Sequence, residues 1–169
     1  MNSFDAELTL EAYLQKSYYK TASLIANSAK ASAVLSEVAP EVQEYFYQYG
    51  KNLGLAFQIV DDILDFTGSE EVLGKPAGSD LRNGHLTAPA IYAVEEYPGI
   101  GTFLDREFSQ EGDLEQALAW VRQSQGINRA RELAFHHAGL AAQCLEPLEV
   151  SPVRDCLQNL TEYVVRRLY

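Results

Sequence analysis

The sequence is poor in several residue types, and each shortage excludes a class of protein. Only two cysteines occur in 169 residues, and Cys144 and Cys156 lack the spacing of a metal site, so we expect reduced thiols. Lysine and arginine number 13 against 24 acidic residues, and the net charge of -11 argues against non-specific binding to nucleic acid or anionic membranes. Apolar runs stay short of the ~20 residues that cross a bilayer, so no membrane span is expected. We therefore expect a soluble, cytoplasmic protein that meets polyanions through a few placed cations or a metal ion.

Helical periodicity dominates what is present. Apolar residues make up 47% of the chain and recur every three or four positions, without strand-like alternation longer than about four residues. We therefore predict an all-α protein with a single domain over residues 1–169. The predicted helices cover about 9–37, 41–66, 87–94, 113–125, 127–145 and 152–169, whereas glycines and a proline predict a loop over 67–85.

Local signals support some of these boundaries. Asp113 followed by Gln116 resembles a capping box, and Ser151 before Pro152 is a good pair for a helix start. The segment "EEYPGIG", residues 95–101, is expected to end the helix predicted over 87–94.

Three aspartates interrupt the otherwise apolar stretch "FQIVDDILDF", residues 57–66. At 100° per residue, Asp61, Asp62 and Asp65 share an arc of roughly 100° with Gln58, and apolar side chains fill the rest of the helix. The sequence therefore predicts an apolar helix with one narrow acidic stripe.

The same helix face continues toward the N-terminus over residues with little side-chain bulk, including Gly54 and Gly50. Glycines at this spacing allow another group to approach the helix backbone closely. Either a cleft or a close helix neighbour is therefore expected along this face.

The acidic stripe requires compensation, because neighbouring carboxylates at pH 7 must raise their pKa values, stay hydrated or bind a cation. Asp61 and Asp65 lie one turn apart and can reach a common point, and hard oxygen ligands suit Mg²⁺ or Mn²⁺, which share coordination with phosphate. A solvated acidic face is the alternative, although the apolar flanks count against it. A calcium loop of EF-hand type fits less well, because these residues lie in a helix.

Basic residues near this helix in the sequence suggest an anionic ligand. Lys75 lies in the predicted loop, and Lys20 with Thr21 lies in the middle of the first predicted helix. An ammonium group is a point charge for diphosphate oxygens, and a hydroxyl can donate a hydrogen bond beside it. Each lysine alone is more often a surface residue, but together with the acidic stripe they outline a metal and cation clamp for a diphosphate.

Three segments carry a family resemblance: "YLQKSYYKTASLIANSAKA", residues 13–31; "FQIVDDILDFTG", residues 57–68; and "LGKPAGSDLRNGHLTAP", residues 73–89. In combination they resemble the Lys-Thr helix, the second aspartate-rich motif and the following loop of the trans-polyprenyl diphosphate synthases. The segments "EGDLEQAL", "SQGINRARELA" and "YVVRRLY" resemble the solanesyl diphosphate synthase branch of cyanobacteria and plastids. A plastid location would imply a longer precursor.

The resemblance implies an isoprenoid synthase helical bundle in which Mg²⁺ helps an allylic diphosphate to ionise before isopentenyl diphosphate attacks. By position, it implies metal binding by Asp61, Asp62 and Asp65. It also implies that four residues hold the allylic diphosphate: Lys20, Thr21, Gln58 and Lys75. Catalytic roles then fall to Asp61, Asp62, Lys20 and Lys75.

The sequence departs from the family pattern in two places. Many members have a lysine where this chain has His85, which is a weaker cation at neutral pH and is not predicted as a ligand. The family's first aspartate-rich motif has no match in these 169 residues. We therefore expect the C-terminal half of a synthase, with little elongating activity alone, that forms homodimers or pairs with another synthase chain. The alternatives are a non-catalytic helical subunit of a complete synthase and an unrelated helical bundle.

The adjacent histidines His136 and His137 receive a structural interpretation. On a helix they point about 100° apart, which makes them a poor pair of metal ligands. Both are expected at the surface.

Overall fold

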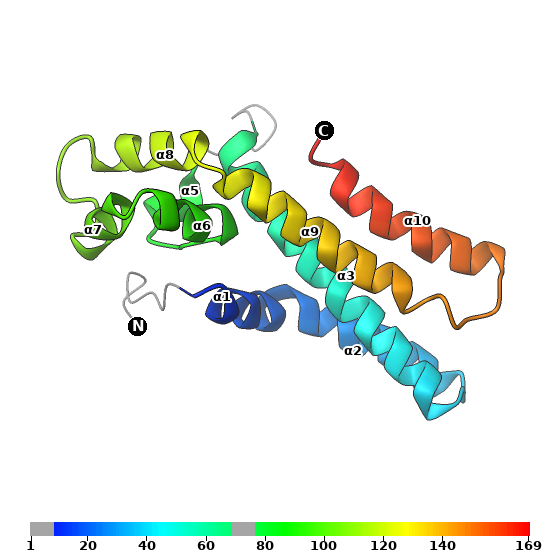
Figure 1. Ribbon diagram of the computed structural model, residues 1–169. Helices are drawn as coiled ribbons and strands as arrows, with labels where there is room; N and C mark the ends of the chain where they lie inside the picture. The colour runs from blue at the N-terminus through cyan, green and yellow to red at the C-terminus, as the bar shows by residue number, and fades with distance from the viewer. Residues whose placement is uncertain (1–8, 69–76) are drawn as a thin grey trace. The chain divides into compact units, whose positions relative to one another are not determined.

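The computed structural model describes residues 9–68 and 77–169, and every regular element in these ranges is a helix (Figure 1). The predicted all-α class is therefore confirmed. No helix in the described ranges is long and apolar enough to cross a membrane. In chain order the elements are α1 (Leu10–Ser17), the π-helix η1 (Tyr18–Ala22), α2 (Ser23–Leu35), α3 (Pro40–Thr67), α5 (Ser79–Arg82), α6 (Ala88–Glu96), α7 (Gly99–Asp105), α8 (Asp113–Gln123), α9 (Gly126–Gln143) and α10 (Pro152–Arg166).

Tertiary contacts divide the chain into two compact units. One comprises residues 1–13 and 61–132, which we call the loop-side unit, and the other comprises residues 14–60 and 133–169, which we call the long-helix unit. Helices α3 and α9 each contribute residues to both. The expected single domain over residues 1–169 stays a prediction.

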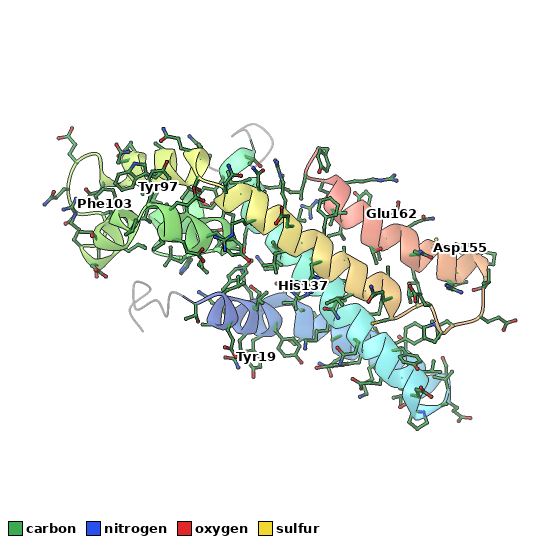
Figure 2. The ribbon with its side chains drawn as sticks, in the orientation of Figure 1. Tyr19, Tyr97, Phe103, His137, Asp155 and Glu162 are labelled. Atoms are coloured by element: carbon green, nitrogen blue, oxygen red, sulfur yellow. The ribbon has the colours of Figure 1, made fainter. Side chains whose placement is uncertain are left out.

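The loop-side unit has an apolar core that the short helices α5 to α8 share with the end of α3. Its largest fully buried side chains include Leu81, Ile100 and Val121. Beside this core the Trp120 ring stacks with Tyr97 and Phe103, at centroid separations of 5.7 and 5.2 Å. Figure 2 labels Tyr97 and Phe103. Aromatic packing of this kind adds stability beyond the apolar area that it buries.

Helix α7 was not predicted, because its glycines and the preceding proline are typical of a helix end. Tertiary packing outweighs that local signal, since Ile100 and Leu104 are both buried in the core. Gly99 also has a steric role: a Cβ atom there would lie 2.8 Å from two ring carbons of Trp120. The absence of a side chain thus lets the helix start lie against the indole. Helix α5 likewise lies inside the predicted loop over 67–85.

The predicted capping box at Asp113 is wrong. Asp113 is the first residue of α8, the N-cap position is Gly112, and no side-chain cap forms there. The Asp113 carboxylate instead accepts hydrogen bonds from the Arg106 guanidinium and from the Gln110 backbone N–H. The hydrogen bond from Arg106 holds the pKa of Asp113 below its ordinary value. A charged partner seven residues earlier has therefore displaced the local capping pattern.

In the long-helix unit, α3 packs closely against η1 and α2. A Cβ atom on Gly54 would lie 2.6 Å from the Ala22 Cα, and one on Gly50 would lie 2.8 Å from both the Ala26 Cα and the Ile25 carbonyl oxygen. Of the two alternatives raised by the small face of α3, a close helix neighbour is therefore confirmed. Only glycine allows the helices to approach to this distance.

Helix α10 begins as predicted and contacts α3. The Ser151 side chain accepts a hydrogen bond from the Arg154 backbone N–H at 3.2 Å, and Pro152 occupies the first turn. Within the same unit, the Tyr49 hydroxyl donates to the Leu157 carbonyl oxygen at 3.0 Å. The N-cap prediction at Ser151 is confirmed.

The expectation that both histidines lie at the surface is half wrong. His136 is exposed, whereas the side chain of His137 is buried against α3, with its Nδ1 3.0 Å from the Asn52 Oδ1. The Asn52 amide nitrogen donates to the Gln48 carbonyl oxygen at 2.9 Å, so its Oδ1 is the atom facing His137. An amide oxygen only accepts hydrogen bonds, so His137 Nδ1 carries the proton. Burial lowers the pKa of His137 to about 4, and His136 and Lys51 add to that shift.

Candidate functional site

Lys20 and Thr21 lie on the π-helix η1, a five-residue interruption within the helical run from α1 to α2. A π-turn inserts an extra residue per turn and so changes the direction in which the following side chains point, and such turns are frequent at functional sites. Lys20 is exposed on this turn, and Thr21 is half-buried. The irregular turn was not predicted, because the sequence there keeps ordinary helical periodicity.

Thr21 and Gln58 are brought together within the long-helix unit although 37 residues separate them. The Thr21 hydroxyl donates to the Gln58 Oε1 at 2.6 Å, and the Gln58 side chain is buried. Since Oε1 accepts this bond, the orientation of the amide is set and its nitrogen side presents donors. Two residues predicted separately as diphosphate-binding therefore form one polar pair.

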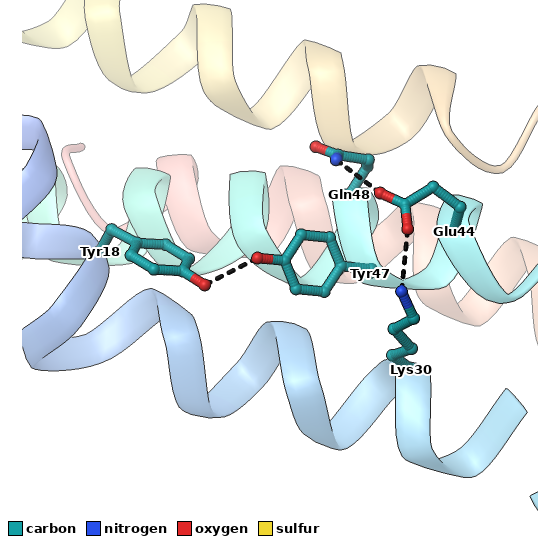
Figure 3. A network of polar contacts seen from close by, with 5 residues as sticks. All are labelled: Tyr18, Lys30, Glu44, Tyr47 and Gln48. Atoms are coloured by element: carbon teal, nitrogen blue, oxygen red, sulfur yellow. Dashed lines mark hydrogen bonds and ion pairs between the residues drawn. The ribbon is translucent and has the colours of Figure 1, made fainter. Parts of the chain in front are cut away.

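A polar network holds α2 and η1 against α3 (Figure 3). The hydroxyls of Tyr18 and Tyr47 lie 2.7 Å apart, and Lys30 donates to Glu44 at 3.0 Å. Gln48 also donates to Glu44, at 2.8 Å. The hydrogen bond from Gln48, followed by that from Lys30, holds the pKa of Glu44 below its ordinary value. These contacts link the helix that carries Thr21 to the helix that carries Gln58.

The three predicted metal ligands lie in the loop-side unit, and their environments differ. Asp61 is half-buried, while Asp62 and Asp65 are almost fully buried. Asp62 accepts a hydrogen bond from the Tyr13 hydroxyl at 2.6 Å. Asp65 accepts from the Ser79 hydroxyl at 2.9 Å and, on its other oxygen, from the Asp80 backbone N–H at 3.1 Å.

The described residues do not present the three aspartates as one preformed metal cage. Among residues 9–68 and 77–169, no three histidine, cysteine, aspartate or glutamate side chains are grouped so that they could hold a metal ion. Carboxylate oxygens are nevertheless the ligands that Mg²⁺ and Mn²⁺ prefer. Metal binding by Asp61, Asp62 and Asp65 stays a prediction. Lys75, the remaining predicted diphosphate ligand, lies outside the described residues.

His85 has an unusual environment for a residue predicted to have no ligand role. Its side chain is half-buried, and its Nδ1 is buried without a hydrogen-bond partner in the described part of the chain. The same holds for the hydroxyl oxygen of Thr87, two residues later.

Two residues around the aspartates were missed by sequence reasoning. Tyr13 bonds Asp62 from 49 residues away, and nothing in the local sequence indicates that contact. Ser79 follows Gly78, whose φ of 74° is favourable for glycine, and a serine after such a turn is a common start for a short helix. That pattern could have predicted α5, although not its bond to Asp65.

Comparisons with known proteins agree on one family. A family model described as polyprenyl synthetase matches residues 1–121. A prenyl transferase from Synechocystis sp. is 60% identical over 169 residues, covering 100% of this chain and 52% of that protein. Solanesyl diphosphate synthase 1, chloroplastic, from Arabidopsis thaliana is 50% identical over 165 residues, covering 98% of this chain and 41% of that protein.

Solved structures show the same fold over a similar extent. Heptaprenyl diphosphate synthase from Staphylococcus aureus matches with a TM-score of 0.90 and 31% identity, covering 96% of this chain and 52% of that chain. A polyprenyl synthase from Caulobacter crescentus, complexed with calcium and isoprenyl diphosphate, matches with a TM-score of 0.86 and 33% identity, covering 98% and 52%. The chain thus spans about half the length of the curated relatives it matches.

Proposed function

Because the chain belongs to the polyprenyl synthetase family, we propose that it serves prenyl transfer, in which isopentenyl diphosphate units are added to an allylic diphosphate. The proposed product is a long all-trans polyprenyl diphosphate of the solanesyl type. The names of the Synechocystis and Arabidopsis relatives support this choice of reaction and product class. The bound isoprenyl diphosphate of the Caulobacter relative supports the choice of ligand.

The observation that carries the proposal is the Thr21–Gln58 hydrogen bond. It fixes the orientation of a buried amide, whose nitrogen is a hydrogen-bond donor, and Lys20 on the same π-turn adds a positive charge. Lys75 is proposed as a second ammonium group for the same diphosphate. Fixed donors of this kind stabilise the charge that develops on a departing diphosphate without reorganising during the reaction.

A divalent metal is proposed to bind at the acidic end of α3, with Asp61 and Asp62 contributing oxygens. Asp61 is the more accessible of the two, and its carboxylate is of the type that Mg²⁺ or Mn²⁺ prefers. When bound, the metal would supply Lewis-acid neutralisation of the diphosphate charge. The calcium in the Caulobacter relative supports a divalent ion in this family.

Ligand binding by the chain tests the proposal most directly. Titration calorimetry with a non-hydrolysable farnesyl diphosphate analogue and Mg²⁺ is expected to detect binding. Thr21→Val and Gln58→Leu are each expected to weaken it by at least about tenfold, because a hydrogen bond to a charged group is worth about 1.5–3 kcal/mol. Thr102→Val, at an exposed threonine of α7, is the control and should leave binding unchanged.

One result would contradict the proposed ligand, and another would contradict the expectation that these residues alone elongate little. Failure to bind the analogue in the presence of Mg²⁺ would contradict the proposed ligand. Incubation with farnesyl diphosphate, labelled isopentenyl diphosphate and Mg²⁺ should yield little long-chain product from these 169 residues alone. Robust elongation would show that the residues present suffice for the whole reaction.

A second candidate function is that of a helical subunit which pairs with another synthase chain or with its own copy. Exposed apolar side chains in the long-helix unit favour it, with Leu24 75%, Leu35 84% and Val153 70% exposed. A contiguous exposed apolar patch marks a protein interface, and these side chains are the candidates for such a patch. Sedimentation velocity at micromolar concentration should therefore show a dimer or a larger species. A monodisperse monomer that also fails to bind a complete family member would argue against this role.

A further inference from the structure

Helix α10 has a wider apolar face than its own chain covers. Its buried side chains lie within about 100° of one another on the helix and are Thr161, Val164 and Val165. The adjoining arc of roughly 80° carries a second row of side chains, which are all exposed and which we call the outer row: Val153, Cys156, Leu160 and Tyr163. Val153 is 70% exposed and Tyr163 63%.

The outer row has the spacing of a helix–helix seam. Its members follow one another at intervals of three, four and three residues, which are the a and d positions of two successive heptads. This spacing keeps one row of side chains facing a second helix along its length. At the next position of the repeat, the Arg167 guanidinium lies 4.9 Å from the centroid of the Phe57 ring, so the row ends there. The outer row therefore fits a helix that carries the same spacing.

A second copy of α10 is such a helix when the two copies run antiparallel. If Cys156 of one copy lies opposite Leu160 of the other, then Val153 lies opposite Tyr163, and a twofold axis generates both contacts twice. Every member of the outer row then has an apolar partner. Because α10 spans residues Pro152–Arg166, this register overlaps nearly the whole length of the two helices.

Charges at the two ends of α10 favour the antiparallel orientation. Glu149, just before the helix, and Arg166, at its end, are both exposed. In the antiparallel register Arg166 of one copy comes level with residues 149–150 of the other, so opposite charges approach at both ends. A parallel pair would instead place like charges side by side. Arg166 also bonds Glu162 in its own helix, but an exposed pair of this kind contributes little.

We propose that two copies of this chain associate through the outer rows of α10 in an antiparallel pair. The proposal rests on the second candidate function, pairing with another chain, and names the surface and the partner. It does not depend on diphosphate binding. Two heptads make a small interface, and small interfaces are typical of weak complexes, so a dissociation constant of about 10 µM is expected.

Sedimentation velocity of the whole 169-residue chain over the micromolar range measures this constant. Val153→Glu and Tyr163→Lys are each expected to raise it at least tenfold, because each places a charge in the apolar seam. An acid near the start of a helix and a base near its end suit the helix dipole, so α10 should stay folded. Leu24→Glu, at a side chain of α2 that is 75% exposed, is the matched control and should change the constant less than twofold.

Combining Val153→Glu with Tyr163→Lys tests the register. In the antiparallel pair the introduced carboxylate faces the introduced ammonium group of the other copy, so the double variant should associate more tightly than either single variant. Ten residues separate the two positions, about 15 Å along the helix, so the charges do not pair within one copy. Val153→Glu combined with Tyr163→Glu should remain at least as weak as the single variants.

The possible failures can be told apart. A dimer that is indifferent to Val153→Glu and Tyr163→Lys would overturn this surface and leave the pairing role standing. A double variant weaker than both single variants would overturn the antiparallel register, and so would a disulfide-linked dimer through Cys156 in a Cys144→Ser background, since this register keeps the two Cys156 residues apart. A monomer throughout the micromolar range would overturn association between copies. Titration with the farnesyl diphosphate analogue decides separately whether the proposed ligand binds.

Discussion

Replacing Gly54 by alanine is expected to lower the free energy of unfolding by about 2 kcal/mol. The new Cβ would lie 2.6 Å from the Ala22 Cα and 2.8 Å from its Cβ, and neither atom can move without shifting the helix. Forcing extra volume into such a contact costs about 3 kcal/mol, and the better helix propensity of alanine offsets about 1 kcal/mol of that loss. Urea unfolding followed by far-UV circular dichroism measures the difference.

Gly139→Ala is the matched control for this prediction. Gly139 also lies inside a long helix, α9, but a Cβ there would meet nothing within 4 Å. The same substitution should therefore stabilise the protein by about 0.5–1 kcal/mol through helix propensity alone. Equal effects at Gly54 and Gly139 would mean that α3 and the helix carrying Ala22 are not in close contact in solution.

Acidification is expected to destabilise the protein through His137 before most carboxylates titrate. In the unfolded chain this histidine has its ordinary pKa near 6.5, and in the folded protein burial lowers the pKa to about 4. A folded-state pKa below the unfolded value means that the unfolded chain binds more protons as the pH falls. The histidine's contribution to stability is therefore intact above pH 6.5 and declines as the pH drops toward 4, by about 2 kcal/mol at pH 5.

Two variants isolate this effect in chemical unfolding measured from pH 7.5 to pH 5. His137→Phe should lower stability at neutral pH, because the Asn52 amide oxygen loses its donor, and should flatten the pH dependence. His136→Gln, at the exposed neighbour, should keep most of the slope. A slope that persists in His137→Phe would place the acid sensitivity elsewhere.

The buried position of His137 illustrates what one sequence leaves open. Histidine occurs both at surfaces and in cores, and the periodicity of α9 does not distinguish these for two adjacent residues. The deciding feature is Asn52, which lies 85 positions earlier and supplies the acceptor for the imidazole. The wrong capping box at Asp113 has the same cause, since Arg106 competes for the carboxylate from outside the local pattern.

For the candidate site, too, the sequence indicated the residues but not their contacts. The sequence indicated Lys20, Thr21 and Gln58 through a family resemblance that the comparisons confirm at the level of the family. It did not indicate that Thr21 and Gln58 bond each other, because the two residues are 37 positions apart and Thr21 lies on a π-turn without a sequence signature. The roles of these residues, and those of Asp61, Asp62 and Asp65, stay predictions.

By itself the sequence determined the helical class, the acidic stripe of α3 and the small face at Gly50 and Gly54, because each depends on the 3.6-residue period within one helix. Only the tertiary structure decided how that face is used and which donors the aspartates meet. Ala22 covers Gly54, Tyr13 bonds Asp62, and Ser79 bonds Asp65. The physical reason is that a hydrogen bond or a steric contact is set by distance in space, and these partners are separated by 14 to 49 residues along the chain.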